Sequence, residues 1–233
     1  THPAAGLLGM TAAEGALTVN GVKMPLDALY KANTEKFAAV YPDKGENHAG
    51  VMTSEPAPRT FAYRGEAVEH PLVYIPVFPG TNCDYDTAKA FRKAGAEVEM
   101  SVLCNLGGDD ILRSIREMKE HIRRAHIFVL SGGFSSGDEP DGSAKFIVNV
   151  LNNKDIRDEI HALLDRGGLI LGICNGFQAL VKSGLLPYGR LGMVTKDSPT
   201  LFRNDINRHI SQIVSTRVST LNSPWLAGFG LGD

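Results

Sequence analysis

The sequence has few cysteines, a single tryptophan, no long apolar run and no excess of one charge. Its three cysteines, Cys83, Cys104 and Cys174, are widely spaced and odd in number, which argues against a disulfide framework and for a reducing compartment. No pair of them has metal-ligand spacing. Because no apolar run could cross a bilayer and no basic-then-apolar signal peptide begins the chain, we expect a cytoplasmic protein without a membrane partner.

The charge balance is nearly even, with 24 lysines and arginines against 26 acidic residues and a formal net charge of −2. No basic block stands out beyond Arg123-Arg124, so we expect no nucleic-acid partner. With 233 residues, 43% of them apolar, the chain is long enough for one α/β domain and an appendage.

Residues 1–70 differ from the rest, because short apolar clusters alternate there with glycine and proline. Asn20-Gly21 is a strong hairpin signal, and Leu26 to Val40 has weak helical periodicity. Met52 to Arg59, rich in proline, is typical of a linker. We therefore predict a domain boundary near residue 70, with the preceding segment too small to build an independent core.

From Pro71 onward, short apolar runs alternate with segments of helical periodicity. We expect strands over 72–78, 97–103 and 126–130 and from Leu169, and helices over 85–93, 109–123, 144–152 and 156–166. This alternation predicts an α/β fold with a doubly wound, mostly parallel sheet and helices on both faces. Active sites of such sheets gather at the carboxyl ends of strands, so the loops after the first, third and fourth strands should share one edge.

The fourth strand leads into a glycine-flanked cysteine. Gly172-Ile173-Cys174-Asn175-Gly176 follows an apolar run, and Phe177 to Val181 continues as an amphipathic helix. A nucleophile at such a turn projects from the sheet, while the helix beginning behind it favours the thiolate over the thiol. The glycines would relieve crowding around a strained turn. The alternative is that Cys174 is a small buried apolar residue.

The loop after the third strand, Ser131 to Asp138, contains adjacent glycines. A backbone N–H at a residue without a side chain can closely approach the oxyanion that forms when an amide carbonyl is attacked. We predict that the N–H groups of Gly133 and Asn175 form the oxyanion hole. An ordinary flexible turn is the alternative for this loop. Asn82 and Asp84 precede a helix and are expected to cap it.

Three blocks together carry a family resemblance: Pro79-Gly80-Thr81-Asn82-Cys83-Asp84, Ser131-Gly132-Gly133-Phe134-Ser135-Ser136-Gly137-Asp138 and Gly172-Ile173-Cys174-Asn175-Gly176-Phe177-Gln178. They resemble the class I, triad-type glutamine amidotransferases, and in particular the glutaminase part of the phosphoribosylformylglycinamidine synthases. The resemblance covers residues 71–233 and implies a flavodoxin-like class I glutaminase fold. Residues 1–60 are similar to the end of the ATP-using synthetase portion in the large single-chain form, which makes residues 61–70 a linker.

The resemblance also implies a function and a set of site residues. Cys174 would attack the side-chain amide of glutamine, form a glutamyl thioester and release ammonia to the synthetase portion of the same parent chain. ATP and magnesium are expected there, and neither a cofactor nor a metal is expected in this chain. Gln178 matches the position that holds the substrate glutamine. The other substrate-binding candidates are Gly132, Phe134, Asn204 and Arg208, although Arg208 is also explained as a solvated surface arginine.

The chain departs from the family in one respect. Members complete the triad with a His-x-Glu pair after the cysteine, and none follows Cys174 here. The only later histidine, His209, precedes Ile210 and Ser211 and is best explained as a surface or core residue. We therefore expect a chain truncated at both ends, with little glutaminase turnover. Two alternatives stay open: another cysteine-elbow hydrolase, such as a peptidase or glyoxalase-like domain, and a non-catalytic docking module.

Overall fold

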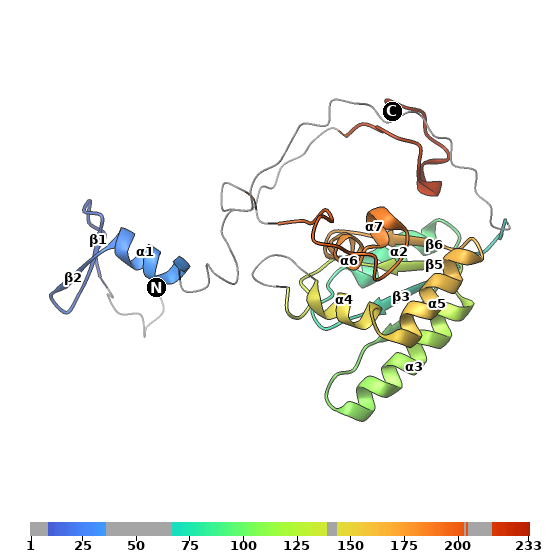
Figure 1. The fold of residues 1–233 in the computed structure, drawn as a ribbon, viewed down its shortest axis with the longest axis horizontal. Helices are drawn as coiled ribbons and strands as arrows, with labels where there is room; N and C mark the ends of the chain where they lie inside the picture. The colour runs from blue at the N-terminus through green and yellow to red at the C-terminus, as the bar shows by residue number, and fades with distance from the viewer. Residues whose placement is uncertain (1–8, 36–66, 139–143, 203, 205–215) are drawn as a thin grey trace. The chain divides into compact units, whose positions relative to one another are not determined.

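The computed structural model describes residues 9–35, 67–138, 144–202, 204 and 216–233. The chain divides into two compact units, Thr1–Thr53 and Ser54–Asp233 (Figure 1). None of the helices in the described ranges is long and apolar enough to cross a membrane.

The described part of the first unit is a β-hairpin followed by a helix. Strands β1 (Ala16–Val19) and β2 (Val22–Pro25) pair antiparallel, and α1 (Leu26–Thr34) follows directly. The predicted turn is confirmed, because Asn20 and Gly21 both have positive φ, 51° and 79°. The predicted helix extended to Val40, but residues 36–40 lie outside the described residues, as does the predicted linker. The division into 1–60, 61–70 and 71–233 stays a prediction.

The second unit contains a four-stranded sheet in the order β4-β3-β5-β6, with every neighbouring pair parallel. This arrangement confirms the predicted fold class. Its elements, in chain order, are β3 (Leu72–Val77), α2 (Asp84–Lys93), β4 (Glu97–Val102), α3 (Gly108–Arg124), β5 (Ile127–Leu130), α4 (Lys145–Leu151), α5 (Lys154–Asp165), β6 (Leu169–Gly172), α6 (Asn175–Ser183), α7 (Leu185–Tyr188) and the 3-10 helix η2 (Pro224–Leu226).

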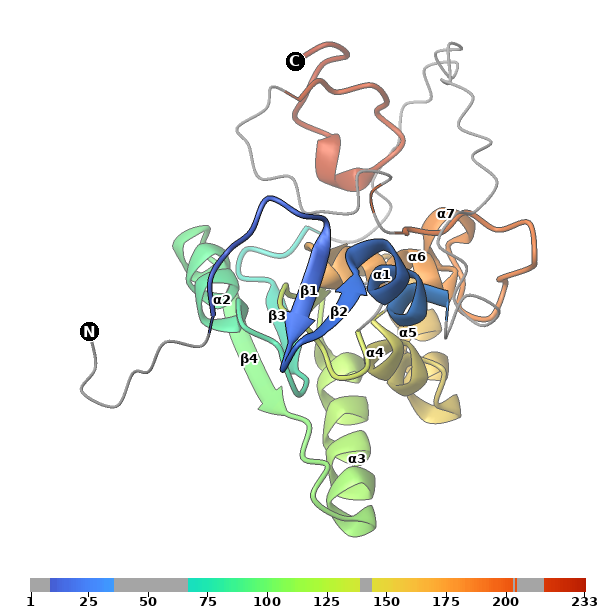
Figure 2. The same ribbon diagram turned by 90° about the vertical axis from the view of Figure 1, so that its left-hand side faces the viewer.

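Successive residues of the central strands point to opposite faces of the sheet, as the two-residue period of a strand requires. Tyr74, Phe128 and Leu130 belong to one buried cluster, which they share with α3, α4, α5 and α6. The alternate positions, Val73, Ile75, Ile127 and Val129, pack in a second cluster with α2 and Trp225. Figure 2 shows α2 on one side of the sheet and α3, α4 and α5 on the other. The sheet is therefore covered on both faces.

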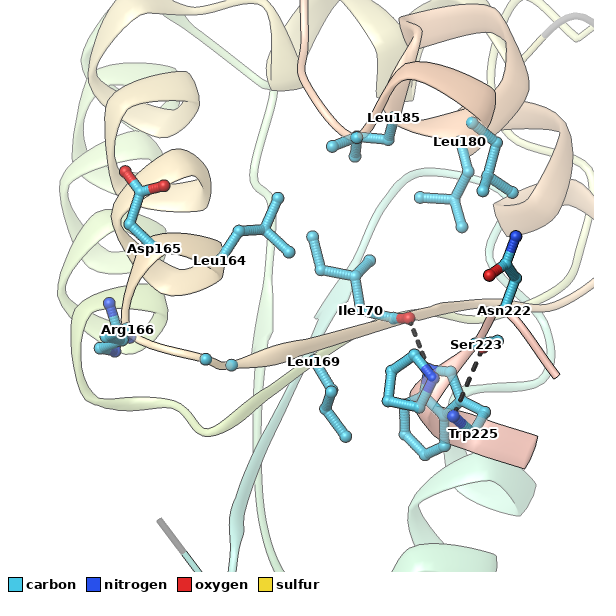
Figure 3. Close-up of a pocket in the computed structure, with 15 residues that line it drawn as sticks. Leu164, Asp165, Arg166, Leu169, Ile170, Leu180, Leu185, Asn222, Ser223 and Trp225 are labelled. Atoms are coloured by element: carbon cyan, nitrogen blue, oxygen red, sulfur yellow. Dashed lines mark hydrogen bonds between the residues drawn. The ribbon is translucent and has the colours of Figure 1, made fainter. Parts of the chain in front are cut away.

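Trp225 fastens the C-terminal segment to the edge strand β6. Its indole N–H donates to the carbonyl of Ile170 at 2.9 Å, and its own backbone N–H donates to the Ser223 hydroxyl (Figure 3). Trp225 therefore anchors the C-terminal segment by packing as well as by hydrogen bonding. Beside it lies a cavity of about 720 Å³, lined by Leu164–Ile170, Leu180, Leu185, Leu186, Gly189 and Asn222–Trp225. None of these residues belongs to the Cys174 turn.

One helix-capping prediction was wrong. The N-cap of α2 is Cys83, and its side chain makes no capping hydrogen bond. Asp84 is instead the first helical residue and is buried, while Asn82 lies before the cap. Asn153, in contrast, caps α5 with its side chain, because its side-chain oxygen accepts the N–H groups of Asp155 and Ile156.

A buried tyrosine connects β3 to its neighbours. The Tyr74 hydroxyl lies 2.6 Å from the Ser101 hydroxyl on β4, and the ring stacks on His121 of α3 with centroids 4.7 Å apart. Burial raises the pKa of Tyr74 far above its usual value, which keeps the phenol neutral. Partial burial acts to raise the pKa of Glu99, but hydrogen bonds with His121 and Arg124 lower it overall.

Candidate active site

Cys174 occupies the turn between β6 and α6. Its backbone has positive φ, with φ 54° and ψ −112°, a conformation that residues with a side chain rarely adopt. Hydrogen bonds on each side hold the turn: Gly176 N–H donates to the Ile173 carbonyl at 2.9 Å, and Gln178 N–H donates to the Cys174 carbonyl at 3.0 Å. The cysteine is exposed. The predicted strand, tight turn and helix are therefore present, with the thiol at the carboxyl edge of the sheet.

The two flanking glycines allow close packing. A Cβ on Gly176 would lie 2.0 Å from the carbonyl oxygen of Leu130, and a Cβ on Gly172 would lie 2.6 Å from Leu180 Cδ1 and 2.7 Å from the Gly176 carbonyl oxygen. Neither glycine is among those with positive φ. The spacing of glycines around Cys174 is thus required because the start of α6 packs against the ends of β5 and β6. The backbone strain resides at the cysteine itself.

The loops after β3 and β5 are hydrogen-bonded to each other. The Gly132 carbonyl accepts the N–H groups of Asn82 at 3.1 Å and Cys83 at 3.3 Å, and the Gly80 carbonyl accepts the N–H of Phe134 at 2.9 Å. Gly133, with φ 143°, fits here because a Cβ would lie 2.5 Å from the Gly80 carbonyl oxygen. The three loops expected at one edge of the sheet do meet there.

The side chain of Asn175 joins the Cys174 turn to the loop after β5. Its oxygen accepts the Ser135 N–H at 3.2 Å, and its amide donates to Asp138 Oδ1 at 2.7 Å and to Gln178 Oε1 at 2.8 Å. Asp138 Oδ1 also accepts the N–H of Ala144, just before α4. Asn175 is almost fully buried. The sequence pattern pointed only to the backbone N–H of Asn175, because these side-chain partners come from a distant loop.

The two N–H groups predicted for the oxyanion hole are available. No acceptor among the described residues takes a hydrogen bond from the backbone N–H of Gly133 or of Asn175. A Cβ on Gly132 would lie 3.2 Å from Cys174 Cβ, so the glycine loop passes directly beside the cysteine. The oxyanion role of these groups stays a prediction.

The other candidate residues are placed differently. Gly132 and Gln178 lie at the turn, the first against Cys174 and the second bonded to Asn175. Phe134 is 75% exposed. Asn204 is exposed too, and both Arg208 and His209 lie outside the described residues. In the described ranges, no group of three histidine, cysteine or acidic side chains could hold a metal ion.

Replacing Cys174 with glycine should stabilise the protein, because a positive φ in this sparsely populated region costs a residue with a side chain about 1–3 kcal/mol. The gain is reduced by roughly 0.5–1 kcal/mol, since glycine gives the unfolded chain more freedom. We expect Cys174→Gly to exceed Cys174→Ala in free energy of unfolding by about 1 kcal/mol. Urea denaturation of the two variants measures this difference. Equal stabilities would mean that the turn is unstrained.

Residues 70–232 match the family model described as the CobB/CobQ-like glutamine amidotransferase domain. This chain belongs to that family. The matched range contains the cysteine turn and both of the loops beside it, so the described geometry is that of a glutamine amidotransferase domain.

Several curated relatives share one name, phosphoribosylformylglycinamidine synthase subunit PurQ. The protein from Dehalococcoides mccartyi is 40% identical over 109 residues, covering 47% of this chain and 38% of that protein. The one from Roseobacter denitrificans is 33% identical over 159 residues, covering 68% and 59%. A solved structure of PurLQS from Thermotoga maritima matches at 32% identity with a TM-score of 0.36, covering 50% of this chain and 46% of that chain. The amidotransferase chain thus spans about two fifths to three fifths of the length of these curated relatives.

Proposed function

We propose that this amidotransferase domain is the glutaminase of a phosphoribosylformylglycinamidine synthase, releasing ammonia from glutamine through Cys174. The observation that carries the proposal is the strained, exposed cysteine placed beside two unengaged backbone N–H groups. The family match and the shared name of the relatives support the substrate and the pathway.

The proposed chemistry has two stages. The Cys174 thiolate attacks the side-chain amide carbon of glutamine, and the carbonyl oxygen takes up negative charge while the N–H groups of Gly133 and Asn175 donate to it. The intermediate collapses to a glutamyl thioester as the amide nitrogen accepts a proton and leaves as ammonia. Water then hydrolyses the thioester. Removing one such donor costs roughly 3–4 kcal/mol of transition-state stabilisation.

The substrate contacts in this proposal come from residues next to the cysteine. Gln178 Oε1 is oriented by the Asn175 amide, and it is the candidate acceptor for the substrate ammonium or amide groups. Gly132 and Phe134 lie in the loop after β5. Asn204 and Arg208 are further candidates from the sequence resemblance. The synthetase portion, using ATP and magnesium, is proposed to receive the ammonia and to belong to the same parent chain.

The 233 residues contain no His-x-Glu pair, and the proton carrier of the triad is therefore unassigned. Thiolate attack on an activated electrophile needs no proton delivery to a leaving amine, whereas turnover of glutamine does. We accordingly propose that this chain forms a covalent adduct much faster than it turns over glutamine.

The test is covalent labelling with a glutamine-mimicking chloroketone, followed by intact mass measurement. We expect one adduct, located on Cys174 by peptide mapping, that excess glutamine suppresses at least tenfold and that Cys174→Ser abolishes. Asparagine, which is one methylene shorter, is the competitor that should protect poorly.

Cys104→Ser is the matched control, because Cys104 follows β4 and takes no part in the described site. Its labelling should equal that of the unaltered chain. An adduct that glutamine does not suppress would contradict the proposal and favour another cysteine-elbow hydrolase. No adduct in a folded protein would favour a docking module.

A further inference from the structure

Two cysteines far apart in the sequence flank one glycine of the loop after β5. A Cβ on Gly132 would lie 3.2 Å from Cys174 Cβ and 3.5 Å from Cys83 Sγ. Gly132 has no side chain, so no atom of that residue beyond its backbone separates the two cysteines. Both cysteines are exposed.

Backbone hydrogen bonds hold this arrangement. The N–H of Cys83 donates to the Gly132 carbonyl at 3.3 Å, and the carbonyl of Cys83 accepts the Thr87 hydroxyl at 2.6 Å and the Thr87 N–H at 3.0 Å. Cys174 is fixed on the other side by the turn between β6 and α6. The backbone positions of both cysteines are therefore fixed, and the sulfur atoms can move only by rotation about the side-chain bonds.

We propose that Cys83 and Cys174 form a reversible disulfide across Gly132 when the protein meets hydrogen peroxide. Cys174 Cβ and Cys83 Sγ both lie within 3.5 Å of the position that a Gly132 Cβ would occupy, so rotation about the side-chain bonds is the motion that would bring the sulfur atoms together. The disulfide requires the two Cβ atoms to lie roughly 3.5–4.5 Å apart. The link would remove the nucleophile and protect it from further oxidation. It depends on the positions of the two cysteines and not on glutamine hydrolysis, so it stands apart from the proposed function.

The chemistry balances with peroxide as the oxidant. The Cys174 thiolate attacks one peroxide oxygen, the O–O bond breaks, and the departing hydroxide takes a proton to become water, leaving a sulfenic acid. The Cys83 thiol then attacks the sulfenic sulfur, the S–O bond breaks, and a second water leaves as the disulfide forms. Two thiols lose two hydrogens, and one peroxide is reduced to two waters.

Both cysteines sit where a helix begins, Cys83 before α2 and Cys174 before α6. Both thiols are exposed, so peroxide can reach them. Cys104 is different, because it follows β4 and is partly buried, with its N–H donating to the Ser114 hydroxyl. The structure thus contains one candidate pair and one separate cysteine that serves as an internal reference.

The experiment treats the protein with a small excess of hydrogen peroxide, alkylates the remaining thiols and measures intact mass and cross-linked peptides. For the unaltered chain we expect the loss of two hydrogens, one alkylated cysteine instead of three, and a peptide pair joining Cys83 to Cys174. Dithiothreitol should restore three reactive thiols. A non-reducing gel checks that the link lies within one chain.

Two variants complete the test. Cys104→Ser should form the same disulfide in the same yield. Cys83→Ser should form none, and Cys174 should instead gain two oxygens as a sulfinic acid that dithiothreitol does not reverse, at least tenfold more than in the unaltered chain. The proposal is overturned if the unaltered chain accumulates that sulfinic acid while Cys83 still reacts with the alkylating agent, or if the linked peptides include Cys104.

The two proposals fail separately. A Cys83–Cys174 disulfide together with chloroketone labelling that glutamine does not suppress would keep the redox pair and reject the glutaminase. Glutamine-protected labelling without a disulfide would keep the glutaminase and reject the redox pair. If both hold, peroxide should abolish chloroketone labelling and dithiothreitol should restore it.

Discussion

Gly176→Ala should destabilise the protein by about 3 kcal/mol or more. The added Cβ would lie 2.0 Å from the carbonyl oxygen of Leu130 and 2.6 Å from its carbonyl carbon, and both are backbone atoms of the central strand β5. A flexible side chain could rotate away from such a contact, but a strand within a paired ladder cannot. The start of α6 would have to move away from β5, and Cys174 would move with it, away from the loop that contains Gly132.

Gly108→Ala is the matched control for this substitution. Gly108 is the first residue of α3, and a Cβ there meets nothing within 4 Å. Alanine is favoured over glycine in a helix by up to about 1 kcal/mol, so this variant should be neutral or slightly stabilised. Thermal and urea unfolding of both variants measures the contrast. Equal stability of Gly176→Ala and Gly108→Ala would show that the α6–β5 contact is not as close as described.

Short-range signals in the sequence predicted much of the fold. Asn20-Gly21 specified a hairpin because both residues tolerate positive φ. The apolar run from Leu169 specified a strand because its residues, although only partly buried at the edge, pack on both faces of a parallel sheet. Such signals depend on a few neighbouring residues. The cap of α2 was predicted incorrectly, because Asn82 and Asp84 have capping chemistry but the chain turns at Cys83 between them.

Other parts of the site depend on contacts between distant segments, which periodicity does not encode. The glycines around Cys174 were correctly singled out, but for Gly176 the reason lies in the carbonyl of Leu130, a residue on another strand. The proximity of Cys83 to Cys174 follows from hydrogen bonds between two loops, although the sheet rule had already placed those loops at one edge.

Asn175→Asp should be the most informative polar substitution, because it changes the chemistry of one buried atom and almost no volume. The Asn175 amide nitrogen donates to Asp138 Oδ1 at 2.7 Å and to Gln178 Oε1 at 2.8 Å. In the variant an oxygen would face both acceptors, and two carboxylates would lie in contact. We expect a loss of about 3–5 kcal/mol at neutral pH, the usual cost of leaving a buried charge uncompensated.

The pH dependence of the stability of Asn175→Asp shows whether the buried carboxylate causes the loss. The new carboxyl would have a folded-state pKa raised above its unfolded value of about 4, since burial and the neighbouring carboxylate both oppose ionisation. The unfolded chain then releases a proton that the folded chain retains, so the destabilisation relative to the unaltered protein should grow from pH 5 to pH 8.

Asn153→Asp provides the matched control for the same chemical change. Its side-chain oxygen only accepts hydrogen bonds, from Asp155 and Ile156 N–H, and aspartate caps a helix about as well as asparagine does. Its stability should change by less than about 0.5 kcal/mol, with no growth towards pH 8. Because the Asn175 side chain connects the Cys174 turn to both Ser135 and Asp138, Asn175→Asp should also lower glutamine-protected chloroketone labelling at least tenfold. Unchanged labelling would show that the turn holds its geometry without that network.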